Sequence, residues 1–242
     1  MENKRTSSKR ASDTRDLKHE SSEDTKIRLL DTAERLFAER GIDGVSLRTI
    51  TINAQANIAS AHYYFGSKQG LIEAIFARRM GALSKQRSAL LDELEKAESV
   101  DVSGVAEAFL RPLANMVVDA DSPERYYVAF LAGVALHPGP ARDVGFLSFN
   151  EQRERISRLM GRALPNVPHE IRMFRFLVVV QAALPLLADL DFARVSWNTA
   201  GVQITRAGLI NQIIKSMADI LAGPTYQESR PLEITKENYS DQ

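Results

Sequence analysis

The sequence predicts an all-α protein in which an N-terminal helix-turn-helix domain of three helices precedes a larger C-terminal helical domain. Apolar residues recur every three or four positions along most of the chain, which is the period of an amphipathic helix. Glycine and proline interrupt this pattern where helices are expected to end. The run Val178–Val180 would also suit a strand, but it lies inside a long helical pattern without partner strands, so we assign it to a helix.

The size and composition of the chain fit this class. Its 242 residues are 44% hydrophobic and 26% charged, so a sizeable core and one or two domains are expected. Residues 1–24 are predicted to be a disordered basic tail and residues 223–242 a second disordered tail, because both hold few large apolar side chains. The helix-turn-helix domain is then expected over residues 25–70 and the C-terminal domain over residues 71–222.

The sequence contains no expected membrane span or secretory signal. The N-terminus lacks an apolar stretch, and the most apolar run, residues 176–188, contains Gln181 and Pro185. That run is shorter than the roughly 20 residues that cross a bilayer. We therefore expect a cytoplasmic protein with no membrane partner.

Apolar spacing and capping residues define the helices of the N-terminal domain. Apolar residues from Ile27 to Phe37 repeat at helical spacing, and Gly41 is a suitable stop for this first helix. Serine and asparagine side chains can then cap the next three helices. These caps and the helices that follow them are Ser46 (47–54), Asn57 (58–65) and Ser67 (67–94).

The C-terminal domain is expected to be helical throughout, with a loop over residues 136–145 that is rich in glycine and proline. Pro185 is expected to kink the helix that contains it. The predicted helices cover residues 106–118, 123–136, 144–163, 168–189 and 199–221.

The third helix carries side chains suited to DNA. In a helix-turn-helix unit the second short helix enters the major groove with its N-terminal end first. Ala59, Ser60 and Ala61 are small enough for a groove about 12 Å wide. Ser60 and His62 can form hydrogen bonds with base edges, and the two alanine methyl groups can contact thymine methyl groups.

Residues at the end of the third helix are suited to the DNA backbone. Tyr63 and Tyr64 can reach phosphates with their hydroxyl groups, and Lys68 adds a positive charge where a helix begins. The alternative is a tight helical corner whose rings pack into a core, as we expect for Phe65.

The charge distribution favours a polyanion at the front of the chain. Residues 1–87 hold 16 Lys and Arg against 11 Asp and Glu, a balance of +5, whereas residues 88–242 hold 15 against 20, a balance of −5. Only the N-terminal part is therefore expected to meet nucleic acid.

The N-terminal motifs resemble those of the tetracycline-repressor (TetR) family of bacterial transcription regulators. The resemblance covers residues 26 to about 76 and rests on KIRLLDTAERLFAERGIDGVSLRTI and AQANIASAHYYFGSKQGLI, above all on the Tyr-Tyr-Phe-Gly-Ser-Lys that ends at Lys68. Family members usually carry glycine where this chain has Gln55, and often valine where it has Ala56. Gln55 is therefore expected either to carry the strain of a positive φ or to bend the turn differently.

The resemblance implies a ligand-responsive transcriptional regulator, expected to be a repressor, that binds a palindromic operator in double-stranded DNA as a homodimer. Its DNA-binding residues carry over to the helix-turn-helix and the residues that flank it. They are Ser46, Arg48, Asn57, Ile58, Ala59, Ser60, Ala61, His62, Tyr63, Tyr64 and Lys68.

The resemblance also implies that the C-terminal domain binds a small molecule and dimerises through its last two helices. The helix after Phe174 is apolar nearly all round and the last helix has an apolar side, so a four-helix seam between two copies is favoured over an intramolecular core. The residues expected at this seam are Phe174, Val178, Leu209, Ile210, Ile213 and Met217.

The effector is expected to be small and mostly apolar, either an acyl or an aromatic compound, with an anionic end met by an arginine such as Arg172 or Arg175. Aromatic residues and polar residues within apolar stretches are the candidates to line its pocket. They are Arg111, Tyr126, Tyr127, Phe130, Phe146, Phe149, Arg172, Arg175, Gln181 and Trp197.

Enzymatic motifs are missing from the sequence. It has no cysteine, its four histidines are not paired at metal-binding spacing, and it lacks a nucleophile elbow, a phosphate-binding loop and a dinucleotide fingerprint. We therefore expect no catalysis, cofactor or metal. The alternative is a helical small-molecule-binding protein or an enzyme that has no role in DNA binding.

Overall fold

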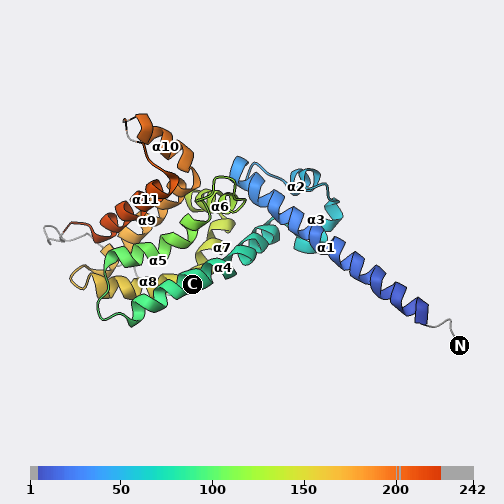
Figure 1. Ribbon diagram of the computed structural model, residues 1–242, viewed down its shortest axis with the longest axis horizontal. Helices are drawn as coiled ribbons and strands as arrows, with labels where there is room; N and C mark the ends of the chain where they lie inside the picture. The colour runs from blue at the N-terminus through green and yellow to red at the C-terminus, as the bar shows by residue number, and fades with distance from the viewer. Residues whose placement is uncertain (1–4, 200, 202, 225–242) are drawn as a thin grey trace, which may run out of the picture.

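The computed structural model describes residues 5–199, 201 and 203–224, which form eleven α-helices and no strand (Figure 1). The all-α prediction is therefore confirmed. The helices are α1 (Arg5–Arg40), α2 (Leu47–Asn53), α3 (Ile58–Phe65), α4 (Lys68–Lys96), α5 (Val102–Asn115), α6 (Arg125–Leu136), α7 (Pro140–Ser148), α8 (Asn150–Ala163), α9 (His169–Ala188), α10 (Leu190–Thr199) and α11 (Arg206–Ala222).

The helices form a small head and a larger body. Helices α1, α2 and α3 lie together at one end, and α4 runs from this head into the body formed by α5 to α11 (Figure 1). A continuous hydrophobic core extends from Leu29 in α1 to Leu221 in α11. Because one core joins head and body, displacement of a body helix can affect the head directly.

The first helix is longer than the sequence predicted. Helix α1 begins at Arg5, so residues 5–24, which we expected to be disordered, are helical. No glycine or proline interrupts residues 5–40, so nothing stops the core-anchored part of the helix from extending backwards. Residues 1–24 are also not basic overall, because they hold six Lys and Arg and six Asp and Glu. The predicted tail at residues 223–242 lies outside the described residues except for Gly223 and Pro224.

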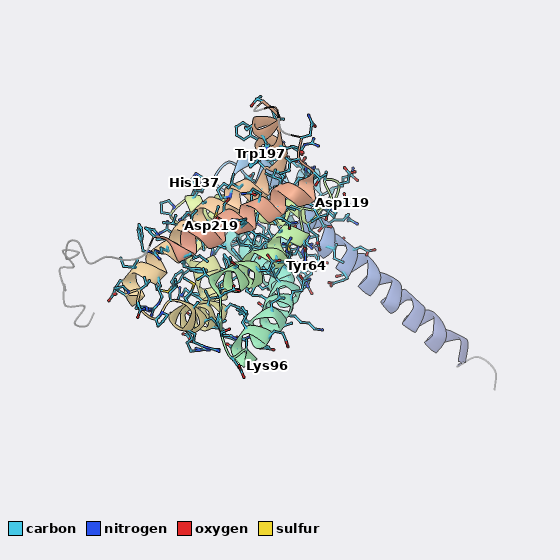
Figure 2. The ribbon with its side chains drawn as sticks, turned by 60° about the vertical axis from the view of Figure 1, so that its left-hand side comes forward. Tyr64, Lys96, Asp119, His137, Trp197 and Asp219 are labelled. Carbon is cyan, nitrogen blue, oxygen red and sulfur yellow. The ribbon has the colours of Figure 1, made fainter. Side chains whose placement is uncertain are left out.

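Two predicted helices of the body have different bounds. The segment predicted over 144–163 is divided into α7 and α8 by Phe149, which has φ −104° and ψ 8°. Helix α7 begins at Pro140, within the loop predicted over 136–145, because proline suits the first turn of a helix. The segment predicted over 199–221 contains only α11, which starts after its cap residue Thr205. Residues 190–199 form a separate helix, α10, which projects from the body and carries Trp197 (Figures 1 and 2).

Helix α9 closely matches the segment predicted over residues 168–189. Its 20 residues are long and apolar enough to cross a membrane by length and composition, contrary to our expectation. However, one side of α9 is buried in the protein core through Phe176, Val179, Ala183 and Leu187. Core helices of proteins without a membrane span pass the same test of length and composition, so one such helix does not by itself indicate a membrane span.

A buried carboxylate joins the head to α4. Glu34 of α1 is only 1% exposed and accepts hydrogen bonds from Arg78 (Nη2 to Oε2, 2.5 Å) and Arg79 (Nη2 to Oε1, 2.9 Å). Arg79 also pairs with Glu124, just before α6, at 3.4 Å. Because both partners of Glu34 lie on α4, a shift of α4 must either move α1 with it or break a buried ion pair.

Candidate nucleic-acid interface and internal cavity

Side-chain caps fix the turn between α2 and α3. The Ser46 hydroxyl accepts a hydrogen bond from the Thr49 amide at 3.0 Å, and the Asn57 Oδ1 accepts one from the Ala59 amide at 2.9 Å. Both predicted caps are confirmed. Gln55 has φ 50°, so the expected positive φ is confirmed at a residue that carries a Cβ.

The outward side of α3 combines small and polar side chains. Ala59 and His62 are exposed, Ser60 is half-exposed, and Tyr63 is 81% exposed. Ile58, the first residue of α3, is also exposed. A side with such small residues can approach another surface closely, while Tyr63 reaches beyond it.

The hydrogen bond of His62 determines what this side chain can recognise. Its Nδ1 lies 2.9 Å from the Gly66 carbonyl oxygen. A carbonyl can only accept, so Nδ1 carries the proton and the neutral ring presents Nε2 as an acceptor. His62 is therefore suited to a donor such as the exocyclic amino group of cytosine or adenine.

Two residues of α3 do not face outward as we predicted. Ala61 is 0% exposed and belongs to the core, so its methyl group cannot contact thymine in this structure. Tyr64 lies beside α1 (Figure 2), where its hydroxyl donates to the Ser22 carbonyl at 3.0 Å and lies 2.7 Å from the Ser22 hydroxyl. This hydroxyl therefore braces α3 against α1.

The remaining predicted DNA-binding residues surround α3. Arg48 on α2 is exposed, and Lys68 is the half-exposed first residue of α4. The Ser67 side chain caps α4 by accepting from the Gly70 amide at 3.1 Å. Lys68 thus lies at the positive end of a helix dipole, a place that favours an anion.

The body encloses a cavity of about 520 Å³ between α4, α5, α6, α7, α8 and α9. Its walls are mostly apolar, with Phe109, Leu113, Val134 and Ile156 among them. This size and character are typical of a small-molecule site. Phe146 and Leu177 are exposed and also line the cavity, so its opening lies between α7 and α9.

The cavity has a basic lining. The described residues that line it include Arg87, Arg142 and Arg153 and no aspartate or glutamate. Arg87 is 0% exposed, and its guanidinium lies 4.7 Å and 5.1 Å from the ring centroids of Phe109 and Phe149. Arg142, by contrast, is exposed.

Arg87 is incompletely paired. Its Nη2 donates to the Phe109 carbonyl oxygen at 3.0 Å, while Nε and Nη1 are buried without an acceptor among the described residues. Burial lowers the pKa of Arg87 to about 10, so the group still carries its charge at neutral pH.

The two phenyl rings offset only part of the cost of burying Arg87. A cation–π contact contributes about 0.5–2 kcal/mol, whereas removing an ion from water costs several kcal/mol. The guanidinium therefore destabilises the empty fold, and an anion in the cavity would relieve that cost. A buried group of this kind is a candidate functional residue.

Three of the predicted ligand-binding residues line the cavity: Phe146, Phe149 and Gln181. Trp197 lies on α10 and is not among the lining residues. The predicted arginines stabilise other parts of the body. Arg111 pairs with Glu107 and Asn211, Arg172 donates to the Leu164 and Val167 carbonyls, and Arg175 donates to the Leu221, Ala222 and Pro224 carbonyls.

The predicted aromatic residues of α6 also lie outside the cavity wall. Tyr127 and Phe130 are buried in the core, and Tyr126 contacts the guanidinium of Arg125. Phe130 lies 5.3 Å from Phe76, centroid to centroid, and Phe76 does line the cavity. Phe130 therefore lies behind Phe76, which forms part of the cavity wall.

The predicted dimer residues fall into two groups. Leu209, Ile210, Ile213 and Met217 of α11 are buried by their own chain, so the alternative of an intramolecular core holds for them. Phe174 and Val178 of α9 are exposed apolar residues, and Leu186 on the same helix is exposed as well. An uncovered apolar stripe therefore lies on α9 and not on α11.

The sequence contained a signal for Arg87 that we missed. Leu83, Arg87 and Leu91 follow each other at intervals of four on α4, and all three are fully buried. An arginine on an apolar helical stripe marks a buried charge. Gln152, a buried residue of the cavity lining, gave no such signal, because charged residues lie on both sides of it in the sequence of α8.

Comparisons with known proteins place the chain in a family. The pattern of bacterial regulatory proteins of the tetR family matches residues 29–75, and that of the tetracyclin repressor-like C-terminal domain matches residues 107–219. The chain therefore belongs to the tetR family of bacterial regulatory proteins, which is a family of transcriptional regulators.

Individual relatives are more distant. The probable HTH-type transcriptional regulator YttP of Bacillus subtilis (strain 168) is 36% identical over 61 residues, which are 25% of this chain and 30% of YttP. The match thus spans less than a third of that relative.

Solved structures share the fold. AibR, in complex with isovaleryl coenzyme A and operator DNA, has a TM-score of 0.54 at 20% identity, over 81% of this chain and 97% of AibR. The hemolysin II transcriptional regulator HlyIIR has a TM-score of 0.53 at 16% identity, over 82% of this chain and 99% of HlyIIR.

Proposed function

We propose that this protein is a ligand-responsive transcriptional regulator, a repressor, that binds a palindromic operator as a homodimer in the cytoplasm. The observation that carries the proposal is the outward side of α3, where small residues and His62 lie in a capped helix-turn-helix of the tetR type. Such a helix can enter a major groove, with Ser60 and His62 at base edges and Tyr63 and Lys68 at phosphates.

The direct test is binding to the DNA that flanks the gene of this protein, measured by fluorescence anisotropy over a range of salt concentrations. Lys68→Ala should weaken binding to all sequences about equally and reduce the salt slope by roughly one unit. Lys96→Ala is a matched control, because Lys96 ends the same helix far from Tyr64 (Figure 2). The proposal fails if the wild-type protein binds no flanking DNA even at low salt, or if both variants lose affinity equally.

The proposed dimer uses the exposed side of α9. Phe174, Val178 and Leu186 are apolar and exposed on one helix, and Phe192 and Val195 of α10 are exposed apolar residues as well. Exposed apolar surface of this extent favours a partner, and a second copy supplies the two-fold symmetry that a palindromic site requires. Helix α11 supports this surface from within its own chain.

The cavity is proposed to hold a small, mostly apolar effector that releases DNA. A chain of aromatic contacts connects the cavity to the head: Phe76 in the cavity wall lies 5.3 Å from Phe130, and Phe130 lies 6.1 Å from Phe37 of α1. The Arg79 pairs with Glu34 and Glu124 join the same helices. An effector that displaces α4 would therefore move the head, and a coupling free energy of about 1–3 kcal/mol is ordinary for such a regulator.

A helical small-molecule-binding protein without a role in DNA binding is the second candidate, and the cavity favours it. The two candidates differ in one measurement, because only the regulator binds flanking DNA in a sequence-dependent and salt-dependent way.

A further inference from the structure

We propose that the effector is a small apolar monocarboxylic acid whose carboxylate pairs with the buried guanidinium of Arg87 on α4. This inference rests on the proposed function only in calling the acid an effector, because binding of the acid can be measured without DNA.

The unpaired nitrogens of Arg87 require an acceptor. Nε and Nη1 are buried and have no acceptor within the part of the chain that the structure describes, although Arg87 belongs to the cavity wall. Buried donors in proteins are nearly always satisfied, so an acceptor supplied by a ligand would account for these two nitrogens. Arg153 Nη1, in the same cavity wall, is also buried without a partner among the described residues, but Arg153 itself is partly exposed. A carboxylate is the acceptor that best matches a guanidinium in charge and geometry.

Arg87 is the only fully buried arginine among the described residues that line the cavity, so the deep part of the cavity carries one positive charge. Among the described lining residues there is no acidic side chain to neutralise Arg87, so the ligand must be the anion. A phosphate monoester carries nearly two negative charges at neutral pH, and one guanidinium would leave the second uncompensated among apolar walls. A monoanion fits this position, and the apolar walls beyond it fit an alkyl or aryl group.

Phe149 gives the carboxylate a route to Arg87. Its ring lies over the guanidinium at 5.1 Å, and the residue lies between α7 and α8, in neither helix. The ring can therefore turn aside without breaking a helix. Arg142 and Arg153 line the same cavity and would attract an anion from solvent.

The test is isothermal titration of the full-length protein with octanoate, decanoate and 4-phenylbutanoate and with the primary amide of each acid. Wild-type protein should bind at least one acid tenfold or more tightly than its amide, because the amide has the same shape without the charge. Arg87→Met should abolish this preference while the amide binds as in the wild type. Arg158→Met, at an exposed arginine of α8 that does not line the cavity, should keep the preference.

Several results would overturn the inference. They are equal binding of acid and amide by wild type, a preference that survives in Arg87→Met, loss of the preference in Arg158→Met, and no binding of any of the three acids. Binding of acyl thioesters but not of free acids would likewise place the anionic group at the mouth and not at Arg87. If Arg87→Met does not fold, Arg87→Lys serves instead, and its acid preference should fall at least threefold.

Failure of this inference is distinguishable from failure of the proposed function. Operator binding without any acid tests the regulator alone, and an acid preference that depends on Arg87 tests the cavity alone. If the wild-type protein binds its operator but none of the acids, only the inference about Arg87 is contradicted. If the protein binds the acid through Arg87 but binds no flanking DNA, only the proposed function is contradicted.

Discussion

Gln55 occupies a backbone conformation that glycine adopts at lower cost. Its φ of 50° places a side chain in the left-handed region, where the Cβ crowds the backbone. The turn between α2 and α3 keeps this geometry because the caps on both sides fix it. Single residues thus determine the orientation of α3 through a strained φ, two caps and the hydrogen bond of Tyr64.

Replacing Gln55 by glycine should stabilise the protein. Gln55→Gly removes a cost of about 1 kcal/mol in the folded state, although the greater freedom of glycine when unfolded offsets part of it. We expect a net gain of about 0.5 kcal/mol in the free energy of unfolding, measured by urea denaturation. Gln55→Ala keeps the Cβ and is the control, so an equal gain in both variants would contradict the explanation.

His62 should influence base preference and not general affinity. Because Nδ1 donates to the Gly66 carbonyl, the neutral ring offers Nε2 as an acceptor. His62→Ala should cost about 1–3 kcal/mol on the best operator and should flatten discrimination at one base pair per half-site. Competition binding with singly substituted operators measures this discrimination. A uniform loss of affinity over all sequences would indicate that His62 contacts the DNA phosphate backbone and not a base.

At the scale of elements, α1 and α4 are held together by a buried network and α9 presents an uncovered side. The network around Glu34 differs in kind from surface pairs such as Arg35 with Glu39, because Glu34 is removed from water. The exposed stripe on α9 differs in kind from the apolar side of α11, which is already buried.

Loss of the Glu34 carboxylate should be costly. Glu34→Ala leaves Arg78 and Arg79 partly buried with only Asp31 and Glu124 as partners, so we expect a loss of about 2–3 kcal/mol in unfolding free energy. Glu39→Ala should cost less than about 1 kcal/mol, because its pair is exposed. Urea denaturation of both variants measures the difference, and similar losses would contradict a special role for Glu34.

Charged substitutions should separate dimerisation from folding. Val178→Glu places a charge on the exposed side of α9 and should give a folded monomer by light scattering and circular dichroism. Ile213→Glu buries an unpaired charge inside the chain and should unfold it, because Ile213 is core. A folded monomer from Ile213→Glu, or an unaltered dimer from Val178→Glu, would indicate that α11 and not α9 forms the dimer interface.

At the scale of the whole molecule, periodicity and caps predicted where the helices lie in the sequence but not which helices pack together. The caps at Ser46, Asn57 and Ser67 are local, so the sequence located α2, α3 and the start of α4 correctly. The cavity depends on how six helices converge, and neither helical period nor residue type reveals which apolar side faces a void. For the same reason the sequence could not distinguish the buried side of α11 from the exposed side of α9.

The coupling between cavity and head should depend on Phe76. If decanoate binds, it should weaken operator binding by about 5–150-fold, the range of ordinary allosteric coupling. Phe76→Leu keeps an apolar wall but removes the ring that contacts Phe130, so the fold-change should shrink while decanoate still binds. Anisotropy with and without the acid measures both, and an undiminished fold-change would exclude the aromatic route.

The length of α4 turns a small shift in the cavity into a large one at the DNA. This helix runs without interruption from Lys68 to Lys96, and Arg87 lies 19 positions after Lys68. At about 1.5 Å per residue, the two are roughly 28 Å apart along the axis. A tilt of about 6° around Arg87 would therefore swing the first turn of α4 by roughly 3 Å, which is the length of a hydrogen bond. If the proposed carboxylate binds at Arg87 and the operator at the first turn of α4, the helix would act as a lever that pivots at the acid and moves at the DNA phosphates.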